Sequence, residues 1–110
     1  MNREIDPHEA VEYLIKNAPR FAQAKADRVF IEEFRKSKKA LLMRQSGESA
    51  IGAQERDAYA HPEYVELLKG LQAAVQVEEE LRWMMIAAQA RIDVYRTQSA
   101  TARMQDKATS

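Results

Sequence analysis

The sequence predicts an all-α protein, a helical hairpin with one long, coiled-coil-like C-terminal helix, on the strength of three observations. Residues that favour helices are abundant, and only three Gly and three Pro interrupt the 110 residues. Residues 62–104 repeat apolar side chains at alternating steps of three and four, as the helices of coiled coils do. Residues 19–44 carry a second helical pattern, long enough to fold back antiparallel on part of the first.

The long helix is expected to begin at Pro62, because proline suits the first helical position. Its apolar seam contains one charged residue, Glu78. We favour the interpretation that Glu78 is solvated where the hairpin is thin; the alternative is an ion pair with Arg28, Arg35 or Lys38. The members of the seam are Tyr64, Leu67, Leu71, Ala74, Glu78, Leu81, Met85, Ala88, Ile92 and Tyr95.

The other elements are predicted from their boundary residues. Asp6 can cap a short helix over 7–16, which Asn17 and Pro19 are expected to end. A second helix is expected over 19–44, with the apolar stripe Phe30, Ile31, Phe34, Leu41 and Leu42.

The segment 46–61 is either a loop or a loop that contains a short helix over about 49–59. Gly70, inside the long helix, predicts a close helix contact or a mild bend. The polar tail 105–110 is expected to fray. All these elements form a single domain, 1–110.

The middle of the long helix predicts self-association. Apolar side chains between Trp83 and Ala90 point in every direction around the helix, and one hairpin partner covers only one side. We therefore expect a homo-oligomer, a dimer or higher, in which the long helices cross near Trp83. Its predicted interface residues are Leu81, Trp83, Met84, Met85, Ile86, Ala88, Ile92 and Tyr95.

The sequence indicates no enzyme. It has no Cys, no glycine-rich phosphate loop and no nucleophile motif, and His8 and His61 lack the spacing of metal ligands. We therefore predict no catalytic residues, no metal site and no cofactor. The apolar run at 83–88 is too short to cross a bilayer, and acidic residues interrupt the opening stretch, so a cytoplasmic location and no membrane partner are expected.

Basic residues near the C-terminus predict an alternative, direct binding of single-stranded DNA. Net charge is zero overall, but residues 81–110 carry five basic and two acidic side chains, whereas 62–80 carry five acidic side chains and Lys69. A basic track beside aromatic rings suits single-stranded nucleic acid, although a solvated flank of the seam would look the same. The residues of this track are Arg82, Arg91, Arg96 and Arg103.

The C-terminal half also resembles small helical proteins encoded by tailed phages and prophages. The resemblance covers about 38–103 and rests on the segments 64–71, 79–83, 87–88 and 91–100. Such proteins often accompany replication and recombination genes, so the resemblance implies a phage-derived origin, a location in the cytoplasm of a bacterial host, and contact with DNA or with recombination proteins. It implies no catalytic residues.

These observations lead to a function of assembly without catalysis. We expect a phage-derived interaction protein that presents a helical surface to a protein partner, as an accessory of DNA replication or recombination. Direct binding of single-stranded DNA is the first alternative. Inhibition of a host defence protein by a small phage protein is the second.

Overall fold

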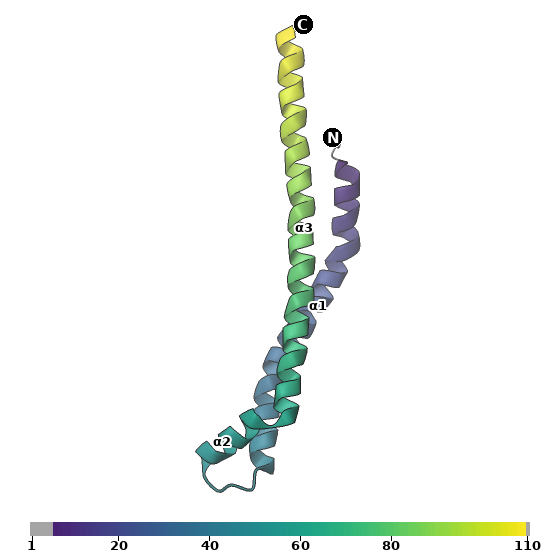
Figure 1. The fold of residues 1–110 in the computed structure, drawn as a ribbon. Helices are drawn as coiled ribbons and strands as arrows, with labels where there is room; N and C mark the ends of the chain where they lie inside the picture. Colours follow the sequence, from purple (N-terminus) through teal and green to yellow (C-terminus); the bar gives the residue numbers. More distant parts are fainter. Residues whose placement is uncertain (1–5, 110) are drawn as a thin grey trace. The chain divides into compact units, whose positions relative to one another are not determined.

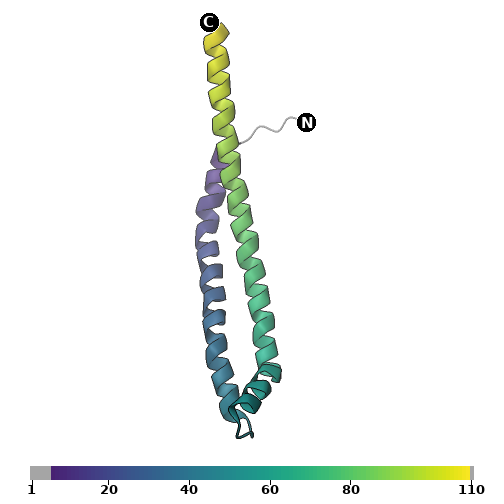
Figure 2. The same ribbon diagram turned by 90° about the vertical axis from the view of Figure 1, so that its left-hand side faces the viewer.

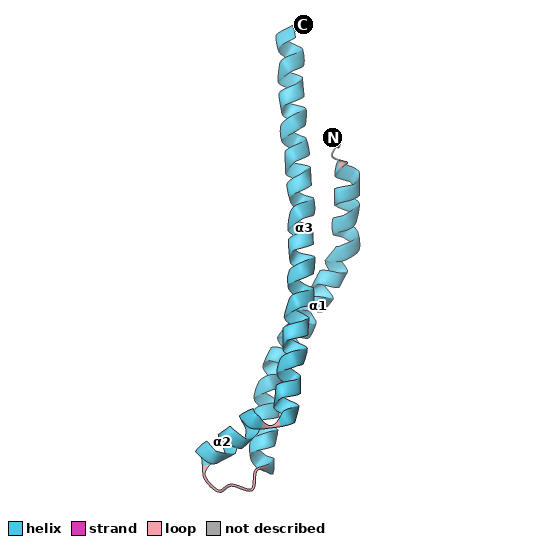
Figure 3. Cartoon of the chain, viewed as in Figure 1, coloured by secondary structure: helices cyan, strands magenta, loops and turns pink. Residues whose placement is uncertain are grey.

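The computed structural model describes residues 6–109 as three helices, α1 (Pro7–Gln45), α2 (Ile51–Ala60) and α3 (Pro62–Thr109), with no strand in that range (Figures 1 and 3). The predicted all-α fold with a long C-terminal helix is confirmed. Contacts divide the chain into two compact units. The hairpin unit spans 22–79, and the terminal unit joins the start of α1, up to Phe21, with α3 from Glu80 onward.

The predicted break between two N-terminal helices is wrong, because α1 continues from Pro7 to Gln45 with Pro19 inside it. Proline lacks an N–H, so the helix forgoes the backbone hydrogen bond to the carbonyl of Ile15. Nearby, the Asn17 side chain is buried and donates a 2.9 Å hydrogen bond to the carbonyl oxygen of Tyr13. Packing of α1 on both sides of the proline outweighs the local cost.

α1 has an inward seam of its own, of which the predicted stripe contained only Ile31 and Leu42. Steps of three and four connect its buried and half-buried positions across Pro19. Phe30, Phe34 and Leu41 of the predicted stripe are instead exposed, Phe30 by 67%. The inward positions include polar residues, which an apolar pattern cannot detect; they are Ala10, Leu14, Asn17, Phe21, Ala24, Arg28, Ile31, Lys38 and Leu42.

In the hairpin unit, α2 packs at the turn that connects α1 to α3 (Figure 2). The short helix that the sequence left open therefore exists. Its Ala58 is fully buried with Leu42 and Tyr64, and the Tyr59 ring meets Tyr64 edge-on with centroids 5.3 Å apart. His61 ends the turn by accepting a 3.1 Å hydrogen bond at Nδ1 from the backbone of Glu63.

The seam of α3 faces inward as predicted, from Tyr64 to Ile92, whereas Tyr95 is exposed. The helix continues to Thr109, five residues beyond the end predicted at 104, and after Gly70 no Gly or Pro interrupts the sequence. Residue 110 of the tail that was expected to fray lies outside the described residues. A Cβ at Gly70 would meet no heavy atom within 4 Å, which excludes a close helix contact there.

Candidate interaction surface

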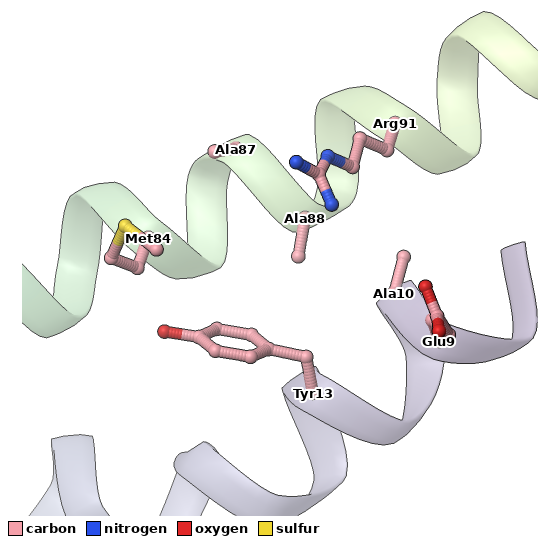
Figure 4. Close-up of a pocket in the computed structure, with 7 residues that line it drawn as sticks. All are labelled: Glu9, Ala10, Tyr13, Met84, Ala87, Ala88 and Arg91. Atoms are coloured by element: carbon pink, nitrogen blue, oxygen red, sulfur yellow. The ribbon is translucent and has the colours of Figure 1, made fainter. Parts of the chain in front are cut away.

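The eight predicted interface residues divide into two groups within the terminal unit. Leu81, Met85, Ala88 and Ile92 belong to the inward seam and are buried or half-buried. Ala88 lies opposite Ala10 and Tyr13 of α1 (Figure 4). Because the chain's own α1 covers this group, only the second group is open to a partner: Trp83, Met84, Ile86 and Tyr95.

Trp83 of the second group also begins a line of apolar residues along α3, which we call the outer seam: Trp83, Ala87, Ala90 and Val94. These residues follow one another at steps of four, three and four, so they share one side of α3. Trp83 lies roughly 140° around the helix from the buried Ala88. All four are exposed, Trp83 by 59% and Val94 by 46%.

The outer seam was not predicted as a continuous line. Trp83 was among the predicted interface residues, whereas Ala87, Ala90 and Val94 were not. The signal was nevertheless present, because their spacing repeats the three-and-four pattern of the inward seam on another side of the same helix.

A small hollow lies between α1 and α3 within the terminal unit (Figure 4). The Tyr13 ring lies beneath Met84 and Ala88, and the Arg91 and Glu9 side chains lie at the other end of the hollow. The hollow therefore offers a mainly apolar wall with one cation and one carboxylate at its rim. Its lining residues are Glu9, Ala10, Tyr13, Met84, Ala87, Ala88 and Arg91.

The four arginines predicted to contact nucleic acid do not share one side of α3. Arg82, Arg96 and Arg103 follow a seven-residue spacing, whereas Arg91 lines the hollow, roughly 140° from Arg96. The Arg82 guanidinium carbon lies 4.8 Å from the centroid of the Trp83 ring. Arg96 Nη1 lies 3.7 Å from Asp93 Oδ1 on the exposed surface.

The hairpin unit contains a bidentate charged contact, between Arg28 and Glu78. Arg28 Nε donates to Glu78 Oε2 at 2.6 Å and Arg28 Nη2 donates to Glu78 Oε1 at 3.0 Å. Hydrogen bonds to Glu78 first, and to Glu32 second, raise the pKa of Arg28 above its ordinary value. The solvated Glu78 that we favoured from the sequence is therefore wrong, and the alternative pairing is correct.

Two ion pairs of the hairpin unit attach its lysines to other helices. Lys39 Nζ lies 3.4 Å from Glu55 Oε1 and 4.8 Å from the centroid of the Tyr59 ring, both in α2. Tyr59, and to a lesser extent Glu55, raises the pKa of Lys39. Lys38 Nζ lies 3.0 Å from Glu63 Oε2 of α3 and lowers the pKa of that carboxyl.

The described residues contain no group of three His, Asp or Glu side chains placed to hold a metal ion. No helix within 6–109 has the length and apolar character to cross a membrane. His8 is exposed near the start of α1, and His61 caps α3. No protein-family model, curated protein or solved structure matches the chain.

Proposed function

We propose that the chain is a helical assembly protein without catalytic activity, a phage-derived accessory of DNA replication or recombination that self-associates through α3 and presents this helix to a protein partner. One observation carries the proposal. The chain fills the inward seam of α3 with its own α1 but leaves the outer seam and its neighbours exposed, Trp83 by 59% and Met84 by 54%. Contiguous apolar surface of this kind is typical of interaction sites.

Sedimentation velocity over a range of concentrations tests the proposal. We expect the purified chain to self-associate, and Trp83→Ala to weaken association by roughly 30-fold or more, as the loss of a large aromatic contact at an interface can do. Phe30→Ala is a matched control, because Phe30 is an aromatic residue with 67% exposure in the other unit. A chain that stays monomeric at about 100 µM, where weak interfaces of small area are still populated, would exclude self-assembly.

Single-stranded DNA is a second candidate partner, favoured by the contact between Arg82 and Trp83. A guanidinium placed over an indole ring provides the charge and the stacking surface that a base and its phosphate require. Arg96 and Arg103 continue this side of α3 with two further cations.

Fluorescence anisotropy with a labelled oligonucleotide tests this candidate. Arg96→Glu combined with Arg103→Glu should abolish binding, and the affinity of the unaltered chain should fall as salt rises. Arg35→Glu combined with Arg56→Glu is the control, because it changes charge equally at two exposed arginines of the hairpin unit. Equal losses from both double variants would indicate general attraction to a polyanion and no defined site.

A further inference from the structure

We propose that a second copy of this chain docks antiparallel on the outer seam of α3, across a two-fold axis between Ala87 and Ala90. This inference rests on the proposed self-assembly and adds its surface and orientation. In such a pair Trp83 of each copy lies against Val94 of the other, and Ala87 lies against Ala90.

The sizes of the side chains in the outer seam fit this arrangement. The two small residues lie at the centre, and the two larger ones lie at the ends. An antiparallel pair places one Trp and one Val in each outer layer, so both ends of the contact are equally wide. A parallel pair would place two Trp rings at one end and two Val side chains at the other, and the helices would be forced apart at the Trp end.

The outer seam is also bounded on both sides. Glu80 precedes Trp83 in the same register, and Thr97 follows Val94. The apolar contact therefore has a defined length and a defined centre, which favours a closed pair over a filament. Along one flank, Met84 of one copy lies beside Arg91 of the other, whose methylene groups can cover the exposed thioether.

The charges of α3 favour the antiparallel orientation. Acidic Glu80 lies before the outer seam and basic Arg91 lies within it, roughly 20° apart around α3, whereas Arg96 lies roughly 150° from the middle of the outer seam. An antiparallel pair places Glu80 of each copy on the same flank as Arg91 of the other, whereas a parallel pair would bring Glu80 level with Glu80 and Arg91 level with Arg91.

Engineered disulfides can test the orientation directly, because the chain has no Cys of its own. The proposed register places Glu80 of one copy opposite Thr97 of the other. Under mild oxidation, a mixture of Glu80→Cys and Thr97→Cys should form a mixed dimer several-fold faster than either variant alone. Two Glu80→Cys copies would hold their cysteines roughly 25 Å apart along the antiparallel helices, which is beyond the reach of a disulfide.

Gln89→Cys is the matched control. Gln89 lies almost level with the proposed axis but roughly 130° around α3 from the middle of the outer seam. It is exposed and should cross-link only at the rate of random collision. Adding Trp83→Ala to both members of the Glu80 and Thr97 pair should reduce their mixed dimer to that same rate.

Other results would overturn the orientation. Efficient cross-linking of each single variant with itself would indicate a parallel pair, and efficient cross-linking of Gln89→Cys would indicate another face. A chain that sediments as a dimer while the mixture stays uncross-linked would contradict this geometry but leave self-assembly intact. A monomer at every concentration would contradict both proposals.

Discussion

Glu78 accepts two hydrogen bonds from the Arg28 guanidinium, at 2.6 and 3.0 Å, from within the apolar seam of α3. Glu78 is 7% exposed, and Arg28 also donates to Glu32, one turn further along α1, at 2.9 Å. Two carboxylates therefore accept from one planar fork, and the pair with Glu78 on the facing helix contributes to the register of α1 against α3 in the hairpin unit.

We predict that Glu78→Ala lowers the free energy of unfolding by roughly 1–3 kcal/mol, because it leaves two donors of a half-buried guanidinium without their acceptor. Urea denaturation followed by circular dichroism measures the change. Glu33→Ala is the control, because Glu33 pairs with Lys36 on the exposed surface of α1 and its loss should change stability by less than about 0.5 kcal/mol.

Replacing both Arg28 and Glu78 by apolar residues tests whether the fold needs this ion pair for its stability. The double variant Arg28→Met with Glu78→Leu should recover much of the stability that Glu78→Ala loses, because no charge remains at the seam. Equal effects of Glu78→Ala and Glu33→Ala would show that the buried pair contributes no more than a surface pair.

The pair between Lys38 and Glu63 predicts a dependence on pH. The hydrogen bond from Lys38, and then its charge, lowers the pKa of Glu63 below its ordinary value of 4.5. A carboxyl whose pKa is lower in the folded state stabilises the fold above its unfolded pKa, and this stabilisation is lost as pH falls through the lowered pKa. NMR titration of the Glu63 carboxyl should show the lowered pKa, and Lys38→Met should return it toward 4.5.

We predict that Gly70→Ala stabilises the protein by roughly 0.5–1 kcal/mol, because glycine in a helix interior costs about that much relative to alanine. The new methyl group would meet no heavy atom within 4 Å, so no clash offsets the gain. Urea denaturation at low protein concentration measures it. A loss of stability would show that another chain or segment lies close to Gly70 in solution.

The inward-facing positions of a helix could be predicted from the sequence where apolar residues are regularly spaced. They could not be predicted where polar side chains or contacts between distant residues determine which side of the helix faces inward. The inward seam of α3 was predicted at eight of its nine positions from Tyr64 to Ile92, because those eight are apolar, whereas Glu78 was expected to be solvated. The seam of α1 contains Asn17, Arg28 and Lys38, and the exposed pair of Phe30 and Phe34 masked it.

The candidate site shows the same division. The sequence predicted that α3 has apolar residues on more than one side, because the apolar residues near Trp83 surround the helix. Which of those residues α1 covers depends on the register of the hairpin, and a polar pair between Arg28 and Glu78 contributes to that register. No local pattern contains this information, because the two residues are 50 positions apart.

Pro19→Ala tests whether packing alone carries α1 across its proline. Pro19→Ala restores the N–H that can bond to the carbonyl of Ile15 and so removes a helix-interior penalty of about 3 kcal/mol. The unfolded chain of this variant has more conformational entropy, which offsets roughly 0.4–1 kcal/mol of that gain. We therefore expect a net gain of about 2–2.6 kcal/mol in the free energy of unfolding measured by urea denaturation. Pro19→Gly restores the same donor but adds chain flexibility, so it should gain less. A loss of stability in Pro19→Ala would show that α1 needs the proline's local geometry to place Asn17.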